Sequence, residues 1–352
     1  MTAETTLVAD PRRYFEAVKA ERSVEADAAP VCVYLEVTNR CNLVCETCPR
    51  SFETLEPPAD MSWELFTRIV DQLPRLTRAV LHGVGEPMLV RDLPRMISYL
   101  KNRGVYVLFN TNGTLLRERR FPELVESGLD ELRVSLDAAD APTYARVRGK
   151  NFFDRIVRDV KRLTDYQKAR DVSTPRVSLW LTGLKETVDQ LPAFVRLAAR
   201  MGVAEVHLQR LVFDEQGFGL SRAESSLFER TQQPEADAIG EAIALGRSLG
   251  VTLDASGATE PGLSLRRAHS NEPWSLCRRP WSLMYFTAHG RALPCCIAPF
   301  SARGYDNYTL GDATQQTLRE IWNGNAYRDF RHRLLSNSPP KPCEGCGLRW
   351  SL

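Results

Sequence analysis

The chain has 352 residues, of which 43% are hydrophobic and 26% charged, the balance of an ordinary globular protein. Its formal net charge is only +2, so electrostatics give no reason to expect nucleic acid or an acidic membrane surface as a partner. No apolar stretch approaches the ~20 residues that a membrane-spanning helix needs. Composition therefore excludes a disordered chain, a collagen-like fibre and a coiled coil.

The predicted elements begin with a short amphipathic helix at residues 11–21, within an N-terminus that lacks the apolar core of a secretory signal. From residue 31 to about residue 211, apolar strand-like runs alternate with amphipathic helical segments. The predicted strands are residues 31–37, 79–81, 106–109, 131–136, 177–181 and 205–211, and the helices are residues 62–73, 92–103, 121–127, 153–167 and 188–200. Such alternation is typical of parallel strands joined by crossover helices, in an open sheet or a partial barrel. In either architecture, ligands bind at the carboxyl ends of the strands.

The periodic signal weakens between residues 213 and 275, where a helix at 232–249 and a short strand at 251–254 are predicted. Past Cys277 the sequence pattern changes to that of a hairpin followed by short helices. Two strands, at 283–287 and 291–294, flank a tight turn that contains Gly290, which predicts a hairpin. Short helices are predicted at 317–322 and 326–335.

The cysteine content indicates metal or redox chemistry. Nine cysteines, an odd number, without an export signal favour a reducing, cytoplasmic compartment over a disulfide framework. Cys41, Cys45 and Cys48 directly follow the first predicted strand, so three thiolates can turn toward one point. Thiolates are the preferred ligands of iron–sulfur clusters, and three of them leave one iron of a four-iron cluster open. On spacing alone, a zinc site completed by a distant residue and three unconnected cysteines stay open as alternatives.

This segment resembles the defining motif of the radical S-adenosylmethionine (radical SAM) superfamily. Residues 83–87, Gly-Val-Gly-Glu-Pro, are similar to the Gly-Gly-Glu-Pro motif of that family, with Val84 inserted between the glycines. Residues 110–116 and 135–138 also resemble family segments, and all four lie at strand ends in the family order. The resemblance implies an α/β partial (β/α)6 barrel. It also implies a 4Fe–4S cluster that binds SAM, a flavodoxin- or ferredoxin-type electron donor, and cleavage of SAM to a 5′-deoxyadenosyl radical.

Residue roles follow from the same resemblance. The backbone at Gly83, Gly85 and Glu86 is expected to receive the methionine ammonium of SAM, since glycine lets the main chain approach closely. Ser135 and Arg148 fall where the family often has groups that face the methionine carboxylate, and Gln209 is a candidate for the adenine pocket. Arg148 in a surface ion pair and Gln209 as a packing residue are the alternatives.

A second group of cysteines, Cys277, Cys295, Cys296, Cys343 and Cys346, lies in the C-terminal part of the chain. A redox pair and a structural zinc site are the alternatives on spacing alone. Beside a radical SAM core, the pattern resembles the SPASM domain or its shortened form, Twitch. That resemblance implies one auxiliary 4Fe–4S cluster, held by Cys277, Cys295, Cys343 and Cys346.

Cys296 is the rival of Cys295 for the fourth ligand position. Neighbours on a strand face opposite ways, and the distance from Gly290 favours Cys295. Cys32 is expected to be a small core residue. Because the sequence ends six residues after Cys346, a second auxiliary cluster is expected to be missing.

Four protein thiolates leave the auxiliary cluster no open iron, so we expect it to transfer electrons rather than bind substrate. This favours dehydrogenation of a small polar substrate, similar to a sugar, an aminocyclitol or a nucleoside. The candidates for the catalytic base, by strand position, are Asp137, Arg148, Glu186 and Arg210. A redox-neutral radical decarboxylase or epimerase uses the same parts.

Two other functions remain as alternatives. A maturase of ribosomally made peptides is one, although about 30 residues before the first strand are few for a separate winged-helix module. A non-enzymatic metal-binding or electron-transfer protein is the other. The predicted organisation is an N-terminal helical extension at 1–30, a radical SAM partial barrel at 31–215, a connecting segment at 216–276, and a small hairpin and helix domain for the auxiliary cluster at 277–352.

Overall fold

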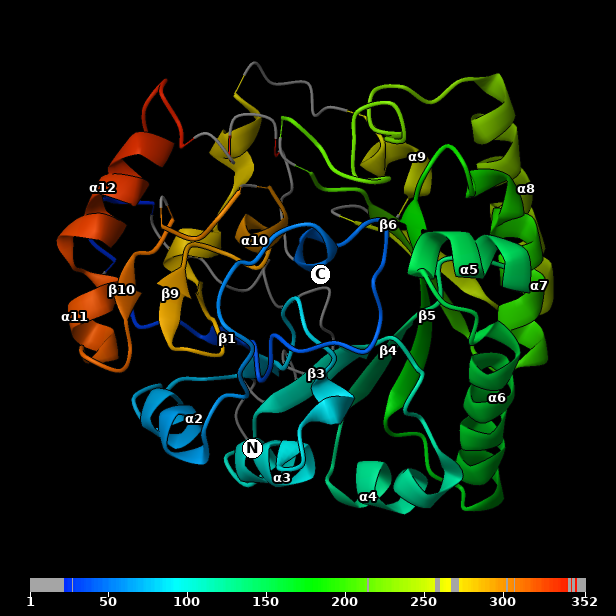
Figure 1. Cartoon of the computed structure of the whole chain (residues 1–352), viewed down its shortest axis with the longest axis horizontal. Helices are drawn as coiled ribbons and strands as arrows, with labels where there is room; N and C mark the ends of the chain where they lie inside the picture. Colours follow the sequence, from blue (N-terminus) through cyan, green and yellow to red (C-terminus); the bar gives the residue numbers. More distant parts are fainter. Residues whose placement is uncertain are drawn as a thin grey trace. The chain divides into compact units, whose positions relative to one another are not determined.

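The computed structural model describes residues 22–26, 28–213, 215–256, 260–266, 272–301, 303–306, 308–340, 343 and 346. The helix predicted at 11–21 and the last six residues lie outside this range. The chain forms two compact units that interleave along the sequence (Figure 1). The first comprises Met1–Arg40, Leu55–Leu108 and Ala268–Leu352, and the second comprises Cys41–Thr54 and Phe109–Arg267.

The strands of the first unit are β1 (Cys32–Leu35), β2 (Arg78–Val80), the first half of β3 (Tyr106–Thr111), β8 (Leu283–Phe286), β9 (Arg291–Leu293) and β10 (Gly311–Asp312). They pair in the order β10-β9-β8-β1-β2-β3. β1 is parallel to both β2 and β8, whereas β8 and β9 form an antiparallel hairpin. The helices are α2 (Trp63–Val70), α3 (Leu93–Lys101), α10 (Ala298–Ser301), α11 (Leu318–Trp322) and α12 (Asn325–Leu334).

The second unit contains the end of β3, β4 (Glu131–Ser135), β5 (Arg176–Gly183), β6 (Glu205–Arg210) and β7 (Thr252–Ala255). The last four are parallel and pair in the order β4-β5-β6-β7. The helices are α4 (Phe121–Glu126), α5 (Ala141–Arg148), α6 (Phe153–Ala169), α7 (Leu191–Arg200), α8 (Gln233–Leu249) and α9 (Pro261–Ser264). In Figure 1, α6, α7 and α8 run along one face of these strands.

Burial explains why these runs form parallel strands. All four residues of β1 are buried, as are those of β2, so both faces of this part of the sheet are covered. Strands buried on both faces read as continuous apolar runs, which is the pattern in the sequence. The helices pack one apolar stripe on the sheet; α2, for example, buries Phe66, Ile69 and Val70.

The predicted fold class is confirmed. Among the described strands the sheet is mostly parallel and not closed into a barrel, and an antiparallel hairpin follows in the C-terminal region. Several details were not predicted. The hairpin strand β8 pairs in parallel with β1, and α5, α9, α10 and β10 form in segments where no helix or strand was predicted.

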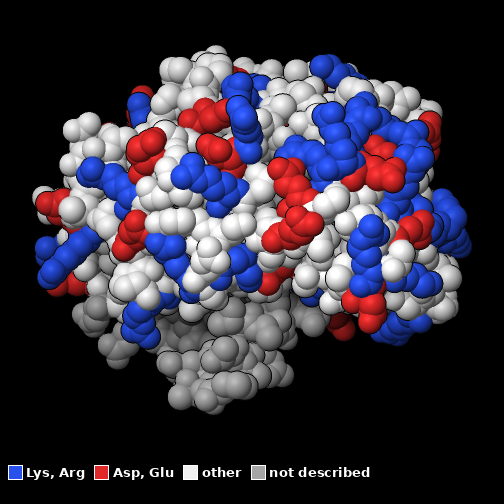
Figure 2. Space-filling model, turned by 90° about the horizontal axis from the view of Figure 1, so that it is seen from below, with Lys and Arg blue, Asp and Glu red and all other residues white. Residues whose placement is uncertain are grey.

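Charge is evenly distributed where it can be seen. On the face drawn in Figure 2, basic and acidic side chains are interspersed, in keeping with the net charge of +2. Among the described residues, no helix is long and apolar enough to cross a bilayer.

Candidate active site

The loop that carries Cys41, Cys45 and Cys48 belongs to the second unit, which fixes its course through main-chain contacts. The Glu46 N–H donates to the Val147 carbonyl at 2.9 Å, and the Glu46 carbonyl accepts from the Leu220 N–H at 2.8 Å. Gly149 has a φ of +76°, and a Cβ there would lie 2.6 Å from the Val44 carbonyl oxygen. Only glycine therefore ends α5 without displacing the cysteine loop.

An amide network reaches the sulfur of Cys41. Asn112, at the carboxyl end of β3, donates from Nδ2 to Cys41 Sγ at 3.7 Å and to Asn42 Oδ1 at 2.9 Å. Asn42 in turn donates to the Thr114 hydroxyl at 2.7 Å. Donors aimed at sulfur stabilise a thiolate, so this network suits a metal-bound cysteine.

Arg148 makes the corresponding contact with Cys45. Its Nη1 donates to Cys45 Sγ at 3.6 Å, and its Nη2 lies 2.6 Å from Asp137 Oδ2. The other oxygen of Asp137 accepts from the Thr182 N–H at 2.7 Å. Burial opposes the charge of Arg148, but Asp137 and the Cys45 thiol outweigh it and raise the pKa of Arg148 above its ordinary value. The structure thus brings together two of the predicted site residues, Asp137 and Arg148.

Cys48 is half-buried, and the desolvation of its thiol, together with the neighbouring Cys45 and Cys41, raises its pKa to about 12. Without metal this thiol is a protonated, apolar group. Iron binding must therefore displace its proton, as metal binding to cysteine does in general.

Gly83, Gly85 and Glu86 lie in the first unit, packed against the end of β1. A Cβ on Gly83 would lie 2.3 Å from Glu36 Cγ, and one on Gly85 would lie 2.1 Å from the Thr38 carbonyl oxygen. The glycines are therefore required by this close packing. The Glu86 carboxylate accepts from the Met88 N–H at 3.0 Å and caps a short 3-10 turn.

Glu36 is the residue in this region that the sequence analysis missed. It is fully buried and accepts hydrogen bonds from the Val84 N–H at 2.9 Å, the Tyr285 hydroxyl at 3.0 Å and the Ala288 N–H at 3.3 Å. Burial raises its pKa to about 7, although the three hydrogen bonds oppose this rise. The sequence feature that could have identified Glu36 is its position as a charged residue at the end of an apolar run.

The remaining predicted site residues of the second unit are separate from the pair of Asp137 and Arg148. Ser135 ends β4, and Gln209 lies near the end of β6. The Arg210 guanidinium lies 3.2 Å over the Phe228 ring. Glu186 accepts from the Ser225 hydroxyl at 2.6 Å through Oε1, while Oε2 is buried with no hydrogen-bond partner among the described residues.

The auxiliary cysteines gather in the first unit. Burial raises the pKa of Cys343 well above its ordinary value, and the neighbouring Cys277, Cys295 and Cys346 raise it further. Cys296 instead receives a hydrogen bond from Tyr34. Cys295 and Cys296 lie past the end of β9, so the alternation of a strand does not separate them as expected.

Arg279 lies among these thiols. Its side chain is 1% exposed, and its Nε and Nη2 are buried with no hydrogen-bond partner among the described residues. Burial disfavours its charge, yet the cysteine sulfurs around it raise its pKa above the ordinary value. Buried donors without partners indicate a missing acceptor, and an iron–sulfur cluster with four thiolates is such an anionic acceptor. The residues present therefore fit an auxiliary cluster.

Within the part of the chain that the structure describes, no group of His, Cys, Asp or Glu side chains is arranged to hold a single metal ion. The ligands of an iron–sulfur cluster stand farther apart than those of a single ion, because the atoms of the cluster lie between them.

Comparison with protein families adds two matches. The model of the radical SAM superfamily matches residues 35–198, and that of the SPASM iron–sulfur cluster-binding domain matches residues 277–347. Residues 35–198 therefore form a radical SAM domain, and residues 277–347 form a SPASM domain. This confirms the predicted cofactors: the radical SAM domain binds a 4Fe–4S cluster and SAM, and the SPASM domain indicates auxiliary iron–sulfur binding.

Two characterised relatives of this radical SAM protein are informative. It is 25% identical to a PqqA peptide cyclase of Granulibacter bethesdensis over 324 residues, which cover 91% of this chain and 80% of that protein. It is 33% identical to the mycofactocin maturase MftC of Mycolicibacterium smegmatis over 184 residues, 52% of this chain and 45% of that protein. In the latter case, as in some other relatives, the matched region spans about half of the relative's length.

Among solved structures, the radical SAM chain is similar to Streptococcus suis SuiB bound to its precursor peptide SuiA. The TM-score is 0.68 at 17% sequence identity, over 91% of this chain and 70% of that chain. This similarity supports the fold.

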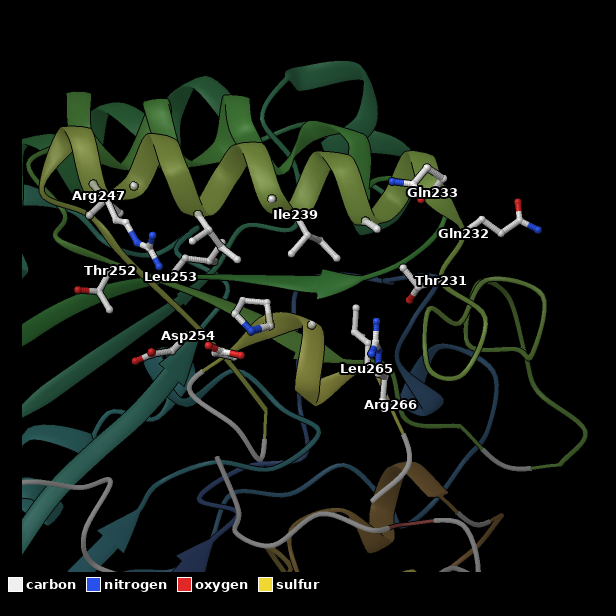
Figure 3. Close-up of a pocket in the computed structure, with 18 of the residues that line it drawn as sticks. Thr231, Gln232, Gln233, Ile239, Arg247, Thr252, Leu253, Asp254, Leu265 and Arg266 are labelled. Atoms are coloured by element: carbon white, nitrogen blue, oxygen red, sulfur yellow. The ribbon is translucent and has the colours of Figure 1, made fainter. Parts of the chain in front are cut away.

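A cavity of about 1060 Å³ lies in the second unit of the radical SAM protein, and none of the predicted site residues is among those that line it (Figure 3). It is formed by α8, β7 and α9, with Ile239, Leu253 and Leu265 among its apolar lining. Arg247 and Asp254 are among the charged residues that line it. None of the cluster cysteines reaches it.

Proposed function

We propose that this radical SAM protein matures a peptide, by forming a carbon–sulfur or carbon–carbon crosslink within a precursor. The match with a PqqA peptide cyclase over nine-tenths of the chain carries this proposal. It favours a peptide substrate over the small polar molecule that the sequence analysis favoured. A dehydrogenase acting on a sugar-like substrate thus becomes the secondary hypothesis.

In this proposal Cys41, Cys45 and Cys48 hold the SAM-binding cluster. Asn112 and Arg148 donate to two of these sulfurs, at 3.7 Å and 3.6 Å. Such contacts orient metal ligands and stabilise their thiolate form. Because Asp137 holds Arg148 in place, it acts as a positioning residue rather than as the catalytic base.

The methionine ammonium of SAM is assigned to the backbone at Gly83, Gly85 and Glu86, and Ser135 and Gln209 stay as further SAM contacts. Glu36 holds this segment in place by accepting a hydrogen bond from the Val84 N–H. Cys277, Cys295, Cys343 and Cys346 are assigned to one auxiliary 4Fe–4S cluster.

When bound, the first cluster supplies the electron that cleaves SAM to methionine and the 5′-deoxyadenosyl radical, and the auxiliary cluster accepts one electron from the substrate. The peptide thus loses one hydrogen atom to the 5′-deoxyadenosyl radical. Formation of the crosslink requires the loss of a second hydrogen as a proton and an electron, which a base and the auxiliary cluster would accept. In total the peptide loses two hydrogens, one as an atom and one as a proton with its electron.

Among the candidate bases, Glu186 is the one we favour. Both carboxylate oxygens of Asp137 are already engaged, one by Arg148 and one by the Thr182 N–H. Glu186 keeps one buried oxygen without a partner among the described residues. A carboxylate oxygen without a partner is available to accept a proton.

The test is co-expression with the short open reading frames that flank the gene, followed by mass spectrometry of the peptides. A peptide that loses a pair of hydrogen atoms only with intact Cys41, Cys45 and Cys48 supports the proposal. Purified protein should also convert SAM to 5′-deoxyadenosine with dithionite as the electron source. Cleavage of SAM without modification of any such peptide, but with oxidation of a polyol, would favour the secondary hypothesis.

A further inference from the structure

A buried cation lies among the thiols of the proposed auxiliary site. Arg279 follows Cys277 by two residues, in a 3-10 turn at Arg279–Trp281. The sulfurs that act on its charge are those of Cys296, Cys277, Cys346 and Cys295. Its Nε and Nη2 have no hydrogen-bond partner among the described residues.

Two other buried arginines are held by oxygen atoms, although each also keeps one buried nitrogen without a hydrogen-bond partner among the described residues. Arg331, on α12, donates to the Pro280 carbonyl at 2.9 Å and to Asn323 Oδ1 at 3.0 Å, and its guanidinium lies over the Trp322 ring. In the second unit, Arg133 is 5% exposed and pairs with Glu131 at 2.8 Å. Arg279 thus differs from these two in facing sulfur rather than carbonyl or carboxylate oxygen.

An iron–sulfur cluster with four thiolates carries a net negative charge, and this charge grows when the cluster is reduced. A fixed cation beside the cluster therefore stabilises the reduced form more than the oxidised form. Burial strengthens this effect because the local dielectric is low. Net charge, hydrogen bonds to sulfur and exposure are the factors that set cluster potentials.

We propose that Arg279 donates hydrogen bonds to the auxiliary cluster and its thiolates and raises the reduction potential of that cluster, which fits it to accept an electron. The inference rests on the proposed function, in which Cys277, Cys295, Cys343 and Cys346 hold the cluster. It assigns Arg279 a positioning and tuning role, since it touches the cluster rather than the substrate. A maturase that crosslinks oxidatively needs such an acceptor, whereas a redox-neutral enzyme does not.

The test is a redox titration followed by electron paramagnetic resonance. To isolate the auxiliary cluster, Cys41, Cys45 and Cys48 are all replaced by alanine, and Arg279→Gln and Arg279→Lys are compared in that background. We expect the midpoint potential to fall in Arg279→Gln and to stay nearer the parent value in Arg279→Lys, with iron and sulfide content unchanged. Arg133→Gln, a buried arginine outside the site, is the matched control and should leave the potential unchanged.

Each outcome decides the matter. A full cluster with unchanged potential in Arg279→Gln would overturn the inference. If Arg279→Gln loses the cluster while Arg279→Lys keeps it, the charge is required and the inference stands. If both lose it, Arg279 acts through shape and packing, and the inference fails. Zinc, or no iron, in the parent background would instead overturn the proposed function.

Discussion

The Glu36 carboxylate accepts a hydrogen bond from the Val84 N–H at 2.9 Å, which joins the end of β1 to the segment assigned to the SAM ammonium. The same carboxylate accepts from Tyr285 and Ala288, in the hairpin of the SPASM region. One buried group thus holds the central strand, the glycine segment and the hairpin together. Two predictions follow from the packing around it.

Replacement of Glu36 by glutamine should alter the pH dependence of stability. The pKa of Glu36 is about 7 in the folded protein, above the value of ~4.3 expected when it is unfolded. The folded state therefore holds the extra proton in this window, and the contribution of Glu36 to stability is full below about pH 4.3 and falls as pH rises to about 7. The loss is at most ~4 kcal/mol.

Glutamine does not ionise in this range, so the Glu36→Gln protein should lack this slope. Denaturant unfolding between about pH 5 and about pH 8 measures the difference between the two proteins at each pH. We expect the stability of the wild type relative to the variant to decline toward pH 7 and then level off. A difference that is constant with pH would show that Glu36 titrates normally.

Gly85→Ala tests the packing of the glycine segment. A Cβ there would lie 2.1 Å from the Thr38 carbonyl oxygen, which is backbone and cannot turn aside. We expect a loss of stability of ~2 kcal/mol or more, as for overpacked core sites, and weaker SAM binding by calorimetry. Gly240→Ala in α8 is the control, because a Cβ there meets nothing within 4 Å. It should be neutral or stabilise the protein by up to ~1 kcal/mol; equal effects of the two substitutions would contradict the packing argument.

Combined replacement of Cys41, Cys45 and Cys48 by alanine should halve the iron content. Two separate sets of thiolates, of three and of four, imply about eight irons per chain in the reconstituted protein and about four in the variant. Formation of 5′-deoxyadenosine should be abolished in the variant. Iron and sulfide analysis beside a SAM cleavage assay gives both results, and unchanged iron would mean that this loop does not hold a cluster.

Much of the fold could be predicted because both faces of the parallel strands are buried. Such strands appear in the sequence as continuous apolar runs, as β1 does. The parallel pairing of β8 with β1 could not be predicted. It joins residues about 250 positions apart, and the sequence of a short buried strand does not show which strand it pairs with. The helix α5 was missed because its sequence lacks a clear apolar stripe. Its N-cap, Asp140, is also a residue type that is common in turns.

The site was predictable where spacing itself carries the chemistry, as in Cys41, Cys45 and Cys48. Glu36 and Arg279 escaped because their roles depend on burial, which sequence does not reveal for a single charged residue. The pairing of Arg148 with Asp137 depends on the left-handed backbone of Asp137, with a φ of 60°. No local sequence pattern predicts a left-handed backbone conformation at an aspartate.

The choice between Cys295 and Cys296 can be settled with matched variants. The sulfurs that act on Cys343 are those of Cys277, Cys295 and Cys346. Cys296 also lies close to Cys295 and Cys346, but its sulfur accepts a hydrogen bond from Tyr34. We therefore expect Cys295→Ala to lose about four irons. Cys296→Ala should keep its iron, and the reverse pattern would show that the ligand choice is wrong.

Cys343→Ala separates the two clusters by function. Cleavage of SAM depends on the first cluster, so the variant should still form 5′-deoxyadenosine, at least slowly. The substrate radical then has no electron acceptor, so no crosslink should form. In deuterated solvent the radical should be quenched back to peptide, with deuterium appearing at the attacked carbon in the mass spectrum. Cys296→Ala, with its cluster intact, should crosslink the same peptide normally. If Cys343→Ala does so as well, the auxiliary cluster is structural, and the electron from the peptide must leave by another route.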